Sequence, residues 1–243
     1  MTNNRPSIAK ITALHLLPGI IITLVFSAIA TWTTKQNLPA PLAILFTWIM
    51  AGIPFELGFL LYQGYLLNHR VSLQGIILFR EPLNKRTFIW LVPLLVVWAL
   101  IALTLLTPSA NKIMSLLFSW FPKQLILSDF AQNISSYPRW SLWLVLILSG
   151  ILNIVVPVIE ELYFRGFLLP RMSSLNNWAP LAGVALFSLY HFWLPWEFFN
   201  RIIALLPMTY AVWRKKNVFI GIWVHCLINS IGTLGLLAFI LNR

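Results

Sequence analysis

The chain of 243 residues is 59% hydrophobic and only 9% charged. Because soluble domains carry about 25% charged residues, this composition excludes an ordinary soluble protein and predicts one that crosses a membrane several times. The net charge of +11 does not indicate a nucleic-acid partner, since the basic residues are spread over short loops between apolar segments and form no single patch.

Seven apolar segments approach the length of about 20 residues that a membrane-spanning helix needs. The first is expected to be a membrane helix, because no small-residue cleavage site of the kind that ends a signal peptide follows it. The sixth is short and contains Pro207, so we expect it to begin earlier, near Trp196, or to tilt. The seven segments are residues 11–32, 42–67, 88–107, 140–169, 178–194, 202–213 and 218–241.

Residues 111–127, between the third and fourth segments, mix large apolar side chains with Lys112 and Lys123. This mixture predicts a helix lying in the membrane interface, with a buried eighth span as the alternative. No internal repeat, low-complexity tract or linker indicates a second domain. We therefore expect a single polytopic, all-α integral membrane domain over residues 1–243.

The distribution of Lys and Arg predicts the orientation of the chain. With the N-terminus in the cytoplasm, eleven of these residues lie on the cytoplasmic side and six on the other side. Cytoplasmic loops usually carry the excess of positive charge, so we expect a cytoplasmic N-terminus and a C-terminus outside. The size of the chain and the absence of an organelle signal favour the plasma membrane of a bacterium.

The fourth apolar segment contains three charged residues: Glu160, Glu161 and Arg165. A charge at the centre of a membrane helix costs roughly 2.5–3.5 kcal/mol, so such groups usually face a protein interior or a water-filled cavity and have a function. In an α-helix, Glu161 and Arg165 share a face and favour an ion pair, while Glu160 points about 100° away. We expect Arg165 to hold Glu161 and to leave Glu160 free for chemistry. An interfacial charge cluster at the cytoplasmic helix end is the alternative.

Two later segments also contain polar residues. His191 lies in the fifth segment, and the seventh contains His225 and Asn229, whose spacing puts them on one helical face. A lone histidine in a membrane helix is as often a packing residue as a functional one, but this set together indicates a site. A desolvated carboxylate can take a proton from water, and a histidine can orient that water. A second histidine and an amide can stabilise the oxyanion that forms when water attacks a peptide carbonyl.

These residues resemble three motifs of the CPBP family of intramembrane endopeptidases, which includes the Rce1-type CAAX proteases and the Abi bacteriocin-immunity proteins. Residues 160–165 match the EExxxR motif, residues 187–191 match FxxxH, and residues 225–229 match HxxxN, in the family's order. The resemblance covers residues 142–231 and leaves the N-terminal spans unassigned. The segment before the last motif lacks the glycines common in the family, although every motif residue is present.

The resemblance implies a glutamate-dependent endopeptidase with an all-helical membrane fold, no metal or other cofactor, and a site open to the cytoplasm. It divides the chain into N-terminal spans with the interfacial segment, residues 1–139, and a catalytic helical core, residues 140–241. The implied substrate is a peptide or a membrane protein within the lipid bilayer, and prenylated CAAX proteins are not expected in a bacterium. By position, Glu160 resembles the water-activating glutamate, His191 its partner, Glu161 and Arg165 the supporting pair, and His225 and Asn229 the oxyanion-stabilising pair.

Three other functions stay open. Two histidines and a carboxylate can bind zinc, although the sequence has no HExxH-type helix, and the single Cys226 excludes a zinc site built on several thiolates. A membrane scaffold or bacteriocin self-immunity protein would need no catalysis. A proton-coupled transporter would also place Glu and His inside the membrane, but transporters usually show repeated halves, and none is visible.

Some polar residues lie outside the motifs. Glu56, in the second segment, is expected to have a structural role or to pair with Arg70, with a place along the substrate path as the alternative. Glu197 lies beside Trp193 and Trp196, and this grouping predicts an interfacial belt at the outer membrane surface.

Overall fold

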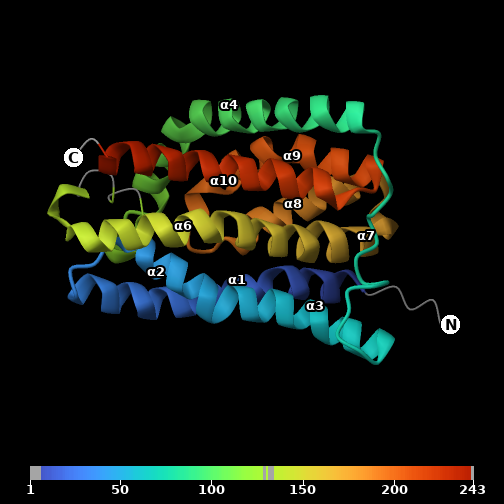
Figure 1. The fold of residues 1–243 in the computed structure, drawn as a ribbon, viewed down its shortest axis with the longest axis horizontal. Helices are drawn as coiled ribbons and strands as arrows, with labels where there is room; N and C mark the ends of the chain where they lie inside the picture. Colours follow the sequence, from blue (N-terminus) through green and yellow to red (C-terminus); the bar gives the residue numbers. More distant parts are fainter. Residues whose placement is uncertain (1–6, 128–129, 131–133, 242–243) are drawn as a thin grey trace.

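The computed structural model describes residues 7–127, 130 and 134–241, apart from the side chain of Phe239. Its long helices lie side by side along one axis and form a bundle (Figure 1). α1 begins at one end of this bundle, and α10 ends at the other. The described residues form no β-strand, and only Arg80 and Asn217 form an isolated bridge. The chain is an all-α integral membrane protein, as the composition predicts.

Among the residues that the structure describes, five helices are long and apolar enough to cross a membrane. They correspond to the first four and the last of the seven predicted segments. Within the first span, polar side chains bond to carbonyls one turn back, as when the Thr23 hydroxyl donates to Gly19 O at 2.7 Å, because lipid offers no other partner. The five spans are Ile8–Lys35, Ala40–Asn68, Lys85–Leu117, Arg139–Arg171 and Val218–Ala238.

The first two spans form an N-terminal hairpin. Ser7 caps α1 by accepting a hydrogen bond from the backbone N of Lys10. The chain then returns as one continuous helix in which a π-helical turn separates two α-helical parts. The elements of this hairpin are α1 (Ile8–Lys35), α2 (Ala40–Thr47), η1 (Trp48–Gly52) and α3 (Ile53–Asn68).

The third span is longer than its apolar core suggested. α4 (Lys85–Leu117) begins after Asn84, whose side chain accepts a hydrogen bond from the backbone N of Arg86, and it continues through Pro108. A proline removes one helix hydrogen bond but need not end the helix. The prediction of a separate interfacial helix over residues 111–127 is therefore wrong, because its first part continues α4. The remainder contains the single turn η2 (Lys123–Leu125) and no eighth span.

The fourth span changes its helical type in the middle. Its first part, α6 (Arg139–Glu160), is an ordinary α-helix, and the π-helical η4 (Glu161–Leu168) and the short α7 (Leu169–Arg171) complete it. π-Helical turns are rare and are often found at functional sites. Glu160 lies 21 residues after the start of the span and 11 before its end, or about 32 Å and 16 Å at the α-helical rise. It is therefore well inside the apolar layer.

The fifth and sixth predicted segments form a shorter hairpin. α8 (Ala179–Tyr190) has 12 residues and a length of about 18 Å, which is too short for the roughly 30 Å hydrocarbon core. α9 (Phe198–Lys215) follows the turn η6 (Pro195–Glu197) and so begins near Trp196, as predicted. Neither helix is both long and apolar enough to be counted as a span. The seven predicted spans are thus five spans and one short hairpin. The hairpin lies between the fourth span and the fifth, which is α10 (Val218–Leu241).

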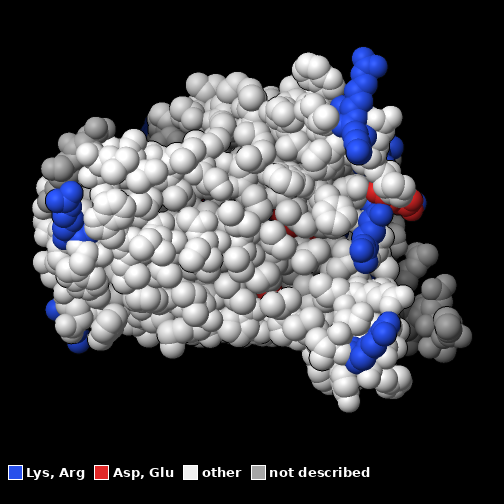
Figure 2. Space-filling model, viewed as in Figure 1, with Lys and Arg blue, Asp and Glu red and all other residues white. Residues whose placement is uncertain are grey.

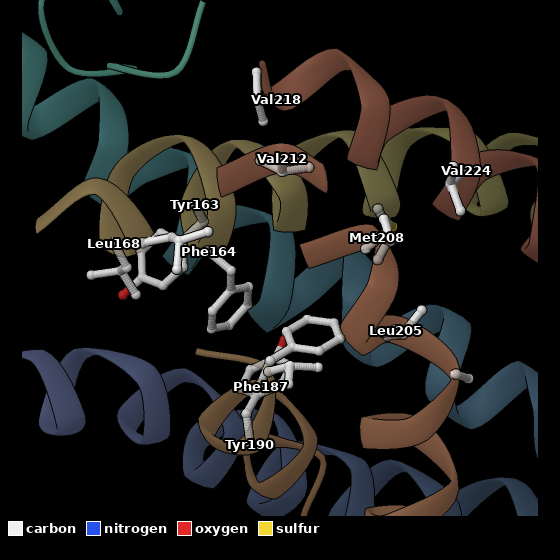
Figure 3. Close-up of a cluster of buried hydrophobic side chains, with 14 of the residues drawn as sticks. Tyr163, Phe164, Leu168, Phe187, Tyr190, Leu205, Met208, Val212, Val218 and Val224 are labelled. Atoms are coloured by element: carbon white, nitrogen blue, oxygen red, sulfur yellow. The ribbon is translucent and has the colours of Figure 1, made fainter. Parts of the chain in front are cut away.

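Aromatic side chains pack η4 against α8 in the centre of the fold (Figure 3). The Phe164 ring points toward Phe187 and Tyr190, with centroid distances of 4.9 and 4.8 Å. α1 approaches the end of α8 so closely that a side chain at Gly19 would collide with the carbonyl of Tyr190. The helices that carry the three motifs are therefore held by close packing on several sides.

Glu56 connects the N-terminal hairpin to α8. It is fully buried in α3, and one of its carboxylate oxygens accepts a hydrogen bond from the Tyr190 hydroxyl at 2.7 Å. Arg70 donates to Gln74 instead, so the alternative that Glu56 pairs with Arg70 is wrong. These contacts agree with the structural role expected for Glu56, because an unpaired buried hydroxyl would be costly.

On the face shown in Figure 2, Lys and Arg gather at the two ends of the molecule, and the broad surface between them shows only a few carboxylate atoms. Many large apolar side chains are exposed on this surface, as expected where lipid replaces water. The end at which α1 begins also holds Arg70, Arg80 and the cluster at residues 214–216. A cytoplasmic location of this end stays a prediction from the Lys and Arg distribution.

Candidate active site

The two adjacent glutamates of the fourth span have different surroundings. Arg165 Nη1 lies 3.1 Å from Glu161 Oε1, so the structure contains the ion pair that the spacing predicts, although the segment is a π-helix. His225 Nδ1 lies 3.0 Å from the same oxygen. The Phe187 ring covers the guanidinium of Arg165 at 3.8 Å, a cation–π contact. Glu161, Arg165 and Glu160 are 0%, 2% and 3% exposed, so the whole group is dehydrated.

Glu160 has no close hydrogen-bond partner at its Oε1 atom within the described part of the chain. Two histidines face its carboxylate from neighbouring helices. His191 Nε2 lies 3.9 Å from Oε1, and His225 Nε2 lies 3.9 Å from Oε2. These distances are too long for direct hydrogen bonds, but one small polar group beside them can contact both a carboxylate oxygen and a ring nitrogen. Glu160 is thus the carboxylate that remains available for a reacting molecule.

The contacts of the histidine rings indicate where their protons are. His191 Nδ1 lies 2.8 Å from the backbone O of Phe187, and a carbonyl can only accept, so Nδ1 carries a hydrogen. In the neutral ring, Nε2 of His191 is then an acceptor that faces Glu160. His225 Nδ1 donates to Glu161 by the same argument. Its Nε2 can donate as well only when the ring carries a hydrogen on both nitrogens.

A cavity of about 600 Å³ lies against these groups and is lined by Glu160, His191, His225 and Asn229. The structure therefore brings residues of all three motifs to the wall of one cavity, and Phe187 lines it as well. Glu161 and Arg165 lie behind this wall and reach it through His225. What these residues do in a reaction stays a prediction.

The cavity extends away from the end at which α1 begins. On α6, the lining residues Asn153 and Val156 precede Glu160, and on α10 Asn229 follows His225. α6 begins and α10 ends at the same end of the bundle, opposite the start of α1 (Figure 1). On α4, the exposed Asn111 also lines the cavity, so it reaches the surface in this direction.

The other side of the site is closed by packing. Phe164, Phe167 and Leu168 of η4 are buried, and a side chain at Gly166 would crowd Ile77. A cytoplasmic N-terminus and a site open to the cytoplasm were both expected, and the structure shows that these two expectations exclude each other. The basic residues favour the first of them.

The short α8 explains why there is space for the cavity. The helix ends at Tyr190, and His191 has the non-helical angles φ −80° and ψ 58°. Non-helical backbone inside a membrane is tolerated only where it is buried in protein or lines a water-filled cavity. The turn after α8 lines the cavity with Trp193, Trp196 and Glu197. Since the two tryptophans are only 3% and 5% exposed, the prediction that they form an interfacial belt with Glu197 is wrong.

Several other polar residues of the cavity wall lie outside the motifs, among them Asn111, Asn153 and Arg201. Asn153 donates to the backbone O of Asn229 and to Thr233 Oγ1, at 3.2 and 2.6 Å, and so joins α6 to α10. Its position two helical turns before Glu160 could have predicted that both side chains face the cavity, because residues seven apart share a helical face. Asn111 and Arg201 had no such signal, since only the tertiary fold brings α4 and α9 to the cavity.

Within the described residues, no three His, Cys, Asp or Glu side chains are arranged to hold a metal ion. Glu160 and the two histidines have the donor types that zinc prefers, and the contacts of Nδ1 with protein acceptors leave Nε2 of both rings facing Glu160. Zinc-dependent hydrolysis stays an alternative for direct test.

A substitution at Gly221 would test whether activity depends on the position of the Glu161 carboxylate. A Cβ atom at Gly221 would collide with Glu161 Oε2, so Gly221→Ala should push the carboxylate away from His225. For the endopeptidase activity that the resemblance implies, we expect a rate at least tenfold lower in purified protein, with a loss of stability of about 1–3 kcal/mol from overpacking. The control is Gly232→Ala on the same helix, where a Cβ meets nothing within 4 Å. Equal cleavage rates for the two variants would show that the Glu161–His225 contact is dispensable.

Comparison with known proteins supports the resemblance described above. Residues 138–231 match the family model described as Type II CAAX prenyl endopeptidase Rce1-like. The matched segment extends from just before α6 into α10 and contains all three motifs. The searches among curated proteins and among solved structures gave no match. The predicted resemblance is confirmed for this segment, and the first three spans lie outside it.

Proposed function

Starting from this Rce1-like segment, we propose that the protein is a glutamate-dependent endopeptidase that hydrolyses a peptide bond of a peptide or membrane-protein substrate within the membrane. We assign the chemistry to the core of residues 140–241. The observation that carries the proposal is the Glu160 carboxylate, which is buried, faces Nε2 of two histidines and lines a cavity. Intramembrane carboxylates are costly, and a role in catalysis explains why one is kept here without a close partner.

The first step is the attack of water on the substrate carbonyl. Glu160 takes one proton from the water, and Nε2 of His191 accepts a hydrogen bond from its other hydrogen, so that the oxygen points toward the carbonyl carbon. As the C–O bond forms, the carbonyl π electrons move onto the oxygen and create an oxyanion. The cavity supplies water from the end of the bundle opposite the start of α1.

The second step is stabilisation and collapse of the oxyanion. The protonated His225 donates from Nε2 and Asn229 donates from its amide, which together form an oxyanion hole. Glu160 then returns its proton to the amide nitrogen, the C–N bond breaks, and a carboxylic acid and an amine are formed. The acid gives its proton to the amine, so that a carboxylate and an ammonium group leave. Glu161 accepts a hydrogen bond from Nδ1 and so orients the His225 ring, and Arg165 balances the charge of Glu161.

The direction of the cavity bears on the substrate. With the N-terminus in the cytoplasm, the cavity opens on the outer side of the membrane, so the cleaved bond belongs to a segment that approaches from that side. A secreted peptide or the outer part of a membrane protein fits this geometry, whereas a cytoplasmic protein does not.

The experiment compares newly formed peptide termini, by mass spectrometry, in membranes that contain wild type, Glu160→Ala or His191→Ala at matched protein level. We expect a set of termini that is present with wild type and lost with both variants. If the termini are the same and the cellular effect of the wild type persists in the variants, the protein acts as a scaffold or immunity protein. A chelator-treated sample tests the zinc alternative, because a glutamate-dependent enzyme should keep its activity while its metal content falls.

A further inference from the structure

A second cavity, of about 550 Å³, lies at the end of the bundle where α1 begins. It is formed between α1, α3 and the end of the fourth span, and it shares no lining residue with the cavity at Glu160. Most of the residues that line it are apolar, among them Leu14, Phe59, Leu66 and Phe167. The proposed protease chemistry makes no use of it.

The position of this cavity along the spans places it at the membrane surface. Lys10 is in the first turn of the first span, Leu67 is next to the last residue of the second, and Arg171 is the last residue of the fourth. Ends of spans lie where the hydrocarbon layer meets the lipid headgroups. The cavity therefore spans the level at which a phosphate group and the start of an acyl chain meet.

The polar residues of the cavity favour an anion. Lys10 and Arg171 line it together with the neutral Gln63, and no carboxylate does. Arg171 is held in place, because its Nη1 donates to the backbone O of Phe167 at 2.6 Å and of Ile76 at 3.3 Å, while its Cζ lies 3.9 Å from the Phe167 ring centroid. An arginine has five N–H donors, and these contacts use only those of one nitrogen.

We propose that this cavity binds one anionic phospholipid. Its phosphate contacts Lys10 and Arg171, and an acyl chain lies along Phe59 and Leu66 toward the bilayer. Basic pockets between membrane helices bind anionic headgroups in this way, and the abundance of Lys and Arg at this end matches a leaflet rich in such lipids. A free phosphate would leave the apolar wall uncovered, so the acyl chain is part of what is recognised.

Native mass spectrometry of the purified full-length protein in detergent tests this proposal. Dioleoyl phosphatidylglycerol, dioleoyl phosphatidylcholine and inorganic phosphate are added separately. We expect one phosphatidylglycerol to bind at least tenfold more tightly than phosphatidylcholine, and inorganic phosphate not to compete. The double variant Lys10→Gln/Arg171→Gln should lose at least tenfold in phosphatidylglycerol affinity. The matched control is Lys35→Gln/Arg139→Gln, which removes two cations at the opposite end of the bundle and should bind as wild type does.

Equal binding of the two phospholipids by wild type, or unchanged binding by the double variant, would overturn the proposal. Displacement by inorganic phosphate would show that only an anion is recognised. If the double variant does not fold, the phosphatidylglycerol affinity of Lys10→Gln tests the proposal instead, because the exposed Lys10 side chain is not part of the packing. One lysine near anionic lipid is expected to contribute about fivefold in affinity, and no loss in this variant would also overturn the proposal.

Discussion

Glu160→Gln is expected to lower the rate of peptide-bond cleavage by about 10²- to 10⁴-fold, the contribution typical of a general base. Glutamine has the size of glutamate but cannot take a proton from water. The fold should tolerate the change, because Oε1 of Glu160 has no hydrogen-bond partner among the described residues that the substitution would remove. The measurement is the initial cleavage rate of purified protein on a substrate found by the comparison of membranes, together with the melting temperature.

Glu81→Gln is the matched control, since Glu81 is an exposed glutamate away from the cavity. It should cleave at the wild-type rate. The assignment of Glu160 as the base would be wrong if Glu160→Gln cleaved within threefold of wild type while its fold was intact. A lower rate explained by unfolding would show itself as a large drop in melting temperature.

Arg165→Met is expected to destabilise the protein by about 3–5 kcal/mol. The methionine fills much of the space under the Phe187 ring, but it leaves the Glu161 carboxylate buried with a charge that only His225 can balance. Removing one partner of a buried ion pair is costly for this reason. Thermal or denaturant unfolding in detergent measures the effect, with wild type in the same detergent as reference.

The double variant Glu161→Gln/Arg165→Met separates the charge effect from packing. Because it removes both buried charges, we expect it to recover most of the stability lost in Arg165→Met. It should not recover activity, since His225 then lacks the carboxylate that orients its ring through Nδ1. If Arg165→Met unfolds at the wild-type temperature, the ion pair contributes little to the fold and its expected role fails.

The residues of the site could be predicted from the sequence because several of them lie close together in it. Glu161 and Arg165 are one helical turn apart, as are His225 and Asn229, and helical periodicity alone puts each pair on one face. An isolated polar residue in an apolar run also indicates a protein-facing position, as the placement of Asn153 shows. The N-terminal contact of Glu56 with Tyr190 could not be predicted, since 134 residues separate the two side chains.

The course of α8 and the direction of the cavity required the structure. Apolar residues that face lipid and apolar residues buried among other helices look the same in a hydropathy profile, so a helix that turns back inside the membrane resembles one that crosses it. Trp193 and Trp196 were misplaced for this reason. Which side of Glu160 is closed depends on how η4 packs against neighbours distant in the sequence, such as Ile77.

The π-helical segment η4 determines how the fourth span would respond to the deletion of one residue. In an α-helix, deletion of one residue rotates everything beyond it by about 100°, which would turn the packed face of a span toward lipid. A π-helical hydrogen bond encloses one residue more than an α-helical one. Deletion of one residue within Glu161–Leu168 can therefore be absorbed by conversion to α-helix, so that α6 and α7 keep their faces. The fourth span can therefore lose one residue directly after Glu160, the carboxylate that we assign to catalysis, without a change in the faces of the helices on either side.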